Sequence, residues 1–251
     1  MSGFIPLLRK ELLEQLRTYR LIIVGGVFLF FGITTPLLLK YLPEIIKLAG
    51  ESVPVEIPPP TAAEALIEYA GTIGQVGVLV AVLVAMGSVA NERSRGTAVM
   101  TLSKPVTRAA FVGAKWAAAS VTFLVSLLAA SLVCLGYTVW LIGPAGAGGF
   151  AGQNLLIALF LLFCLAVTIY FSSLLRSSLA AGGVAIALII AQAAVSAVPG
   201  IGDFLPGKLL AWGNNLVNGN GAGYPWSLAV TIAVVAACLY FAQRALRMRD
   251  L

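Results

Sequence analysis

The chain alternates long apolar runs with shorter polar segments, and this pattern predicts an all-α polytopic membrane protein. A helix of about 20 apolar residues crosses the hydrocarbon core of a bilayer, and six runs are long enough to do so. We expect spans at about residues 21–39, 71–90, 116–142, 155–175, 179–198 and 225–246. Residues 1–251 therefore form a single transmembrane domain.

Residues 1–20 have the pattern of an amphipathic helix lying on a membrane surface. Phe4, Leu8, Leu12 and Leu16 recur every four residues, and charged or polar side chains fill the other faces. This spacing places the apolar side chains on one side of a helix. The alternative is a charged tail that only orients the first span.

The segment between the second and third spans, residues 92–115, is strongly polar. One acid, Glu92, stands against five cations: Arg93, Arg95, Lys104, Arg108 and Lys115. Lipid cannot satisfy such charges, so the segment must lie in water or at the membrane surface. Its excess of Lys and Arg places it on the cytoplasmic side.

Within this segment the residue types predict a short helix suited to docking. Gly96 is a favourable helix C-cap, Pro105 stops the short helix that follows, and Thr107 can cap the helix leading into the third span. A short helix between two long spans can transmit a push into both. An ordinary basic loop that only obeys the topology rule is the alternative reading.

The distribution of cations supports this topology. About thirteen of the sixteen fall on the proposed inner side: Arg9, Lys10, Arg17, Arg20, Arg93, Arg95, Lys104, Arg108, Lys115, Arg176, Arg244, Arg247 and Arg249. With six spans, both termini are then cytoplasmic. The same bias accounts for the net charge of +6, so we expect no nucleic-acid partner.

The composition excludes several classes of chemistry. The chain is 60% hydrophobic and 10% charged, with no histidine, whereas soluble domains carry about 25% charged residues. No ionisable side chain lies near the centre of a span, which argues against an intramembrane enzyme or an ion-coupled transporter. Possible pathway-lining residues are Gln75, Thr168 and Gln192, although hydrogen bonding between helices is the default role of such side chains. The three cysteines lack metal or disulfide spacing.

Residues 91–116, NERSRGTAVMTLSKPVTRAAFVGAKW, resemble the signature of the ABC-transporter type-2 permeases. In that family an acid and basic residues precede Gly-Thr, and a Ser-Lys-Pro-Val-Ser/Thr-Arg run and a Lys follow. The matching positions are Glu92, Arg93, Gly96, Thr97, Ser103, Pro105, Val106, Arg108 and Lys115. The resemblance is nearest to the permease group that serves the maturation of multicopper enzymes, but we carry no copper-related substrate over from it.

The resemblance implies a permease dimer, made of two copies or of two related chains, in the plasma (inner) membrane of a prokaryote. Each subunit would bind a separate cytoplasmic ABC ATPase. The sequence contains no Gly-x-x-x-x-Gly-Lys-Ser/Thr loop, so ATP and Mg would be bound by that partner, with no cofactor, metal or catalytic residue in this chain.

The resemblance also assigns roles to residues. Those expected to couple to the ATPase are Glu92, Arg93, Arg95, Gly96, Thr97, Pro105 and Arg108. Lys10 and Glu11 are expected to brace the surface helix against the segment, and Lys115 to anchor at the lipid headgroups.

The sequence thus predicts the permease subunit of an ATP-driven exporter. The first alternative is a non-transporting accessory, assembly or force-transmitting membrane protein, whose partner would be something other than an ATPase. The second is a secondary transporter, which would work from an ion gradient without ATP.

Overall fold

The computed structural model describes residues 3–48, 59–94 and 106–248, and in these ranges all regular structure is helical. The elements are α1 (Phe4–Arg17), α2 (Arg20–Leu48), α3 (Ala62–Ala85), α4 (Ala90–Ser94), α6 (Arg108–Leu141), α7 (Ala147–Leu174), α8 (Ser178–Ser196), η1 (Gly202–Phe204), α9 (Lys208–Val217) and α10 (Pro225–Met248).

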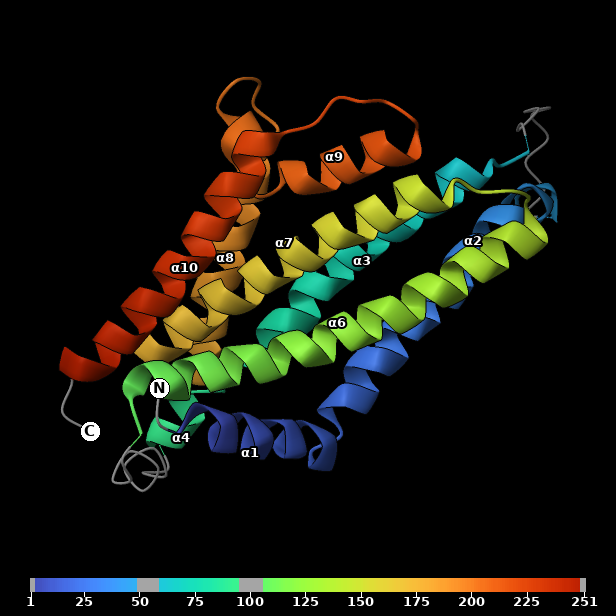
Figure 1. Ribbon diagram of the computed structural model, residues 1–251. Helices are drawn as coiled ribbons and strands as arrows, with labels where there is room; N and C mark the ends of the chain where they lie inside the picture. Colours follow the sequence, from blue (N-terminus) through green and yellow to red (C-terminus); the bar gives the residue numbers. More distant parts are fainter. Residues whose placement is uncertain (1–2, 49–58, 95–105, 249–251) are drawn as a thin grey trace.

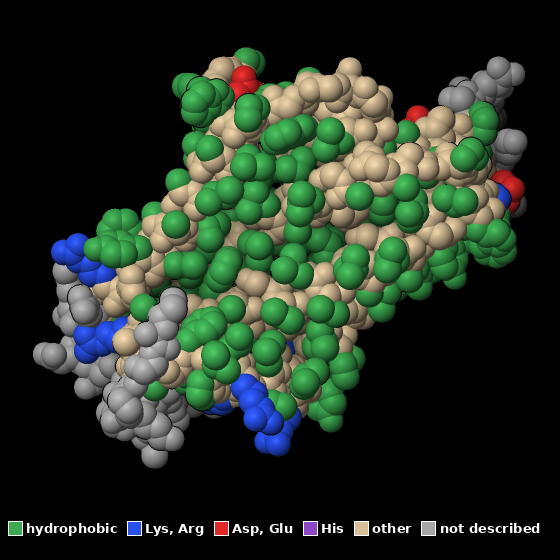
Figure 2. All heavy atoms as spheres, in the orientation of Figure 1, with side chains coloured by type: hydrophobic (Ala, Val, Ile, Leu, Met, Phe, Trp, Pro, Cys, Tyr) green, Lys and Arg blue, Asp and Glu red, His purple; other side chains and the backbone are tan. Residues whose placement is uncertain are grey.

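Six helices in the described part of the chain are long and apolar enough to cross a membrane, as predicted. They are α2, α3 continued through α4, α6, α7, α8 and α10. The start of α1, the short α4 and the end of α10 lie at one end of the bundle (Figure 1). Lys and Arg side chains gather mainly at this end on the face that Figure 2 shows. We call it the basic end.

The first two spans extend further than the sequence pattern predicted. Helix α2 continues to Leu48 with Pro36 and Pro43 inside it, and α3 begins at Ala62 rather than near residue 71. A capping box fixes the start of α3: Glu64 N donates to Thr61 Oγ1 at 3.2 Å, and Thr61 N donates to Glu64 Oε2 at 2.8 Å. Local capping therefore starts the helix about nine residues before the predicted second span, within a polar stretch.

The helix α7 forms the centre of the bundle. Over an apolar stretch of 18 residues in α7, 72% of the residues are buried. The corresponding shares are 28% for α2, 22% for α8 and 17% for α10. The outward faces of α2, α8 and α10 are rich in exposed Leu, Ile, Val and Phe. Exposed apolar side chains on this scale suit contact with lipid or with another membrane subunit.

The end opposite the basic end is closed by η1 and α9, in the region predicted to be a loop. Gly213 of α9 packs against Gln153 of α7, and Gln153 Nε2 donates to Asn214 Oδ1 at 3.0 Å. Gly149 of α7 lies against the Leu216 carbonyl, where only a hydrogen fits. Small residues thus allow α9 to lie directly on α7 (Figure 1).

Candidate functional site

The second span is broken near the basic end, between α3 and α4. Met86–Val89 form a turn, and the buried hydroxyl of Ser172 on α7 makes hydrogen bonds with the main chain at this turn. Val89 N and Ala90 N both donate to Ser172 Oγ at 3.1 Å, and Ser172 Oγ donates to Met86 O at 2.7 Å. One side chain thereby satisfies three main-chain groups that the break removes from the helical pattern.

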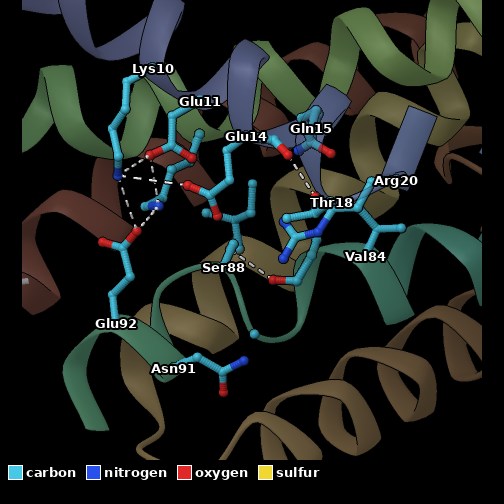
Figure 3. Close-up of a pocket in the computed structure, with 15 residues that line it drawn as sticks. Lys10, Glu11, Glu14, Gln15, Thr18, Arg20, Val84, Ser88, Asn91 and Glu92 are labelled. Atoms are coloured by element: carbon cyan, nitrogen blue, oxygen red, sulfur yellow. Dashed lines mark hydrogen bonds and ion pairs between the residues drawn. The ribbon is translucent and has the colours of Figure 1, made fainter. Parts of the chain in front are cut away.

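Four charged side chains meet beside this break, and we call them the charge cluster: Lys10 and Glu11 of α1, Glu92 of α4 and Lys115 of α6. Lys115 Nζ lies 3.0 Å from Glu11 Oε1 and 2.6 Å from Glu92 Oε1. Lys10 Nζ lies 3.3 Å and 3.7 Å from the same two oxygens. Cations and anions therefore alternate around the cluster (Figure 3).

The charge cluster depends on one stripe of α1. Leu7, Glu11 and Gln15 are the residues of this helix that are buried. Each comes one residue before a member of the predicted apolar stripe that includes Leu8, Leu12 and Leu16. In the structure Leu16 is 53% exposed. The side of α1 that packs on the protein therefore carries a carboxylate and an amide, and the helix is held partly by charge.

The sequence-based prediction that Lys115 anchors at lipid headgroups is wrong. Its side chain is 3% exposed and is enclosed by Glu11, Glu92 and the ring of Phe111, whose centroid lies 5.0 Å from Nζ. A buried ammonium needs such partners because its desolvation is costly. Lys10 is more accessible; burial alone would lower its pKa, but Glu11, Glu92 and Glu14 together raise the pKa above its ordinary value.

A cavity of about 420 Å³ opens next to the charge cluster. Its walls are α1, the start of α2, the α3–α4 break and α6, and its polar lining includes Gln15, Arg20, Ser88 and Asn91 (Figure 3). Gln15 is 6% exposed, and its Oε1 has no hydrogen-bond donor among the described residues. Polar groups thus line a space between the surface helix and the spans.

Three carboxylates of this region, those of Glu11, Glu14 and Glu92, lie within 4.8 Å of one another. Such a spacing could suit a divalent cation. Here the ammonium groups of Lys10 and Lys115 occupy the positions between these oxygens. We therefore interpret the group as an ion-pair network.

The other predicted coupling residues are placed as follows. Arg93 donates from Nη1 to the carbonyl of Ser173 at 2.9 Å, close to the end of α7. Arg108 opens α6, where Ala110 N donates to Thr107 Oγ1 at 3.2 Å, as predicted for the cap. Arg108 faces α10 across a groove. The predicted coupling residues Arg95, Gly96, Thr97 and Pro105 lie outside the described residues.

The three candidate pathway residues lie in different surroundings. Gln75 is exposed on α3, whereas Thr168 is buried in α7 and donates to Cys164 O at 2.7 Å. Gln192 of α8 accepts from Gly207 N at 3.2 Å, so it links α8 to the segment before α9. Of the three, Gln192 links two segments, whereas Thr168 bonds within its own helix.

Comparison with known proteins shows the family of the chain. The family described as ABC-2 family transporter protein matches residues 5–210. The chain belongs to this family. It is also 30% identical over 247 residues to the "Uncharacterized transmembrane protein YxlG" of Bacillus subtilis (strain 168), covering 96% of each chain. Neither match distinguishes the group that serves multicopper enzymes.

Membership of the ABC-2 family identifies the chain as a multi-pass membrane component of a transporter. Such a component works in a lipid bilayer with an ATP-binding partner subunit. Sequence reasoning singled out Glu92, Lys10 and Glu11, and it expected polar side chains of the spans such as Ser172 to bond between helices, but it missed the burial of Gln15 and Lys115. The polar stripe at positions 11 and 15 of α1 was the signal that could have pointed to a buried polar contact.

Proposed function

We propose that this chain is the permease subunit of an ATP-driven exporter, with both termini in the cytoplasm and a separate ABC ATPase bound at segment 92–115. The excess of cations at the basic end supports this orientation. The match to the ABC-2 family supports the partnership. In the membrane the subunit works as a dimer, which the exposed apolar faces of α2, α8 and α10 can accommodate.

The observation that carries the proposal is the 2.6 Å ion pair between Glu92 and Lys115. These residues lie on either side of residues 95–105, and both also contact α1, Lys115 through Glu11 and Glu92 through Lys10. A displacement of the segment by a bound ATPase would therefore move α4, the start of the third span and the surface helix together. The α3–α4 break allows the inner part of the second span to follow.

The partnership is tested by purifying the tagged chain from its native membrane in mild detergent and identifying bound proteins by mass spectrometry. A soluble ATPase with a phosphate-binding loop is expected to co-purify. If none accompanies a monodisperse, folded chain, the proposal fails and the accessory-protein alternative takes its place.

Coupling is tested with Gly96→Val in the complex reconstituted in nanodiscs. A branched side chain at this position should lower the ATP hydrolysis stimulated by the permease on the order of tenfold, equivalent to about 1.4 kcal/mol. Gly136→Val in α6 is the control, because nothing lies within 4 Å of a Cβ at that position. Equal ATP hydrolysis in the two variants would exclude Gly96 from the coupling contact. A Gly96→Val chain that does not insert or fold would show that the residue is structural.

A further inference from the structure

A second polar hollow at the basic end differs from the cavity of the charge cluster. It is a groove between the first turn of α6 and the last turns of α10, and its lining includes Thr107, Arg108, Tyr240, Gln243 and Arg244. The two arginines come from opposite walls, one from the third span and one from the sixth. Neither arginine belongs to the charge cluster or takes part in its ion pairs.

The described lining of this groove is rich in hydrogen-bond donors. The lining carries two guanidinium groups, an amide and a phenol, and no carboxylate is among the described lining residues. Neither Arg108 nor Arg244 makes an ion pair within the described part of the chain. The charge-cluster cavity, in contrast, balances its lysines with glutamates. Unbalanced guanidinium pairs favour phosphate, which they bind with two parallel hydrogen bonds each.

The position of the groove indicates where this phosphate comes from. Arg108 is the first residue of a span, and Arg244 lies two residues before the end of another, at Leu246. Both side chains therefore lie near the basic ends of two apolar helices, where Arg commonly meets lipid headgroups. Tyr240 and Phe241 on α10 are 53% and 50% exposed, which offers apolar surface for acyl chains next to the arginines. Basic pockets between spans on the cytoplasmic side are typical sites for anionic lipid headgroups.

We propose that Arg108 and Arg244 form a binding site for the phosphate of an anionic phospholipid at the cytoplasmic boundary. The bound lipid would bridge the third and sixth spans through its headgroup. Arg108 would then hold a lipid rather than contact the ATPase. This site does not depend on the proposed partnership, since the lipid binds the permease chain itself.

The test is native mass spectrometry of the full chain in detergent, with phosphatidylglycerol and phosphatidylcholine offered in turn. Both lipids carry one phosphate, but the choline cation of phosphatidylcholine is repelled by the two guanidinium groups. The unmodified chain should therefore prefer the anionic phosphatidylglycerol on the order of tenfold. The double variant Arg108→Gln with Arg244→Gln should lose this preference. Arg17→Gln with Arg176→Gln removes the same charge from two exposed positions and should keep it.

Further measurements distinguish a lipid site from a site for a free anion and from general attraction between charges. If inorganic phosphate at millimolar concentration displaces phosphatidylglycerol from the unmodified chain, the groove binds a free anion and the lipid proposal is overturned. Equal loss of preference in both double variants would mean general attraction between charges, which also overturns it. If the double variant Arg108→Gln with Arg244→Gln does not fold, Arg108→Lys with Arg244→Lys is used instead. It keeps both positive charges but cannot form the paired hydrogen bonds of guanidinium groups. This variant should show a weakened preference, and an unchanged one would contradict the proposed site.

Discussion

The two ends of the bundle are held together by different chemistry. At the basic end, α1, α4 and α6 meet through two lysines and two glutamates, of which Lys115 and Glu11 are almost fully buried. At the opposite end, the ion pair described between Lys208 and Asp203 is partly exposed, and the buried contacts of α9 and its neighbours are neutral. Gln153 bonds Asn214, Ser227 bonds the Leu205 carbonyl, and Gly149 lies against the backbone of α9.

This difference indicates which end can change its contacts. Neutral hydrogen bonds and close backbone packing hold one geometry, and any shift leaves a gap or an overlap. Ion pairs act over a longer range, and Lys10 already lies near the same two oxygens that Lys115 contacts. We therefore expect the charge cluster to tolerate exchange between its partners, and the opposite end to behave as a fixed unit.

The largest expected effect comes from removing the central cation. Lys115→Met leaves Glu11 and Glu92 without their buried partner, so the free energy of unfolding should fall by about 3–5 kcal/mol. A thiol-reactive dye during heating measures this, because Cys134 and Cys164 are buried until the chain unfolds. The matched change at the opposite end is Lys208→Met, which removes an ion pair to the 44% exposed Asp203 and should cost about 0–1 kcal/mol. Similar losses in the two variants would abolish the contrast between the ends.

An intermediate loss of stability is expected from adding a methyl group to the close contact between α7 and α9. In Gly149→Ala the new methyl group meets the Leu216 carbonyl, which belongs to the backbone and cannot rotate away, so stability should fall by about 1–3 kcal/mol. Gly148→Ala, one residue earlier in the same helix, has nothing within 4 Å of its Cβ and should be neutral or slightly stabilising. The same thermal assay compares them. Equal stability would show that α9 is free to move away from α7.

The smallest effect concerns pH. Because the carboxylates raise the pKa of Lys10 in the folded chain, its contribution is fully present below the ordinary value of 10.5 and is lost as the pH rises past it. The stability difference between the unmodified chain and Lys10→Met should be below about 1 kcal/mol, constant from about pH 6 to 9, and smaller above about pH 10.5. A difference that changes near neutral pH would mean that another group in the cluster titrates there.

The sequence predicted the six spans because hydropathy over twenty residues reports directly on burial in lipid. It misplaced the ends of α2 and α3, where helix continues into polar residues and a Thr61–Glu64 capping box sets the boundary. Helix α9 was missed because Gly213, Asn214 and Asn215 in its sequence are typical of loops. In the structure Gly213 instead lets the helix pack against Gln153 of α7.

The candidate site could be predicted only in part. Glu92 and Lys10 stood out as charged residues in suitable segments, and the structure places them in one cluster. The partner of Lys115, however, lies 104 residues away on α1. A single sequence shows a lysine near the end of a span, and headgroup anchoring is then the simplest interpretation. Only the packing of α1 against α6 reveals that its position is buried.

The break held by Ser172 gives the second span a joint. Turning α4 relative to α3 there disturbs the three hydrogen bonds of the Ser172 hydroxyl, the bonds of the turn itself and the ion pairs of Glu92. Unwinding a helical turn in lipid, in contrast, would leave carbonyls and amides without partners. The joint also borders a polar cavity, so water can replace those bonds as they open. The break thus lets α4, which carries Glu92, turn against α7 while the longer part of the span, α3, keeps its place in the bilayer.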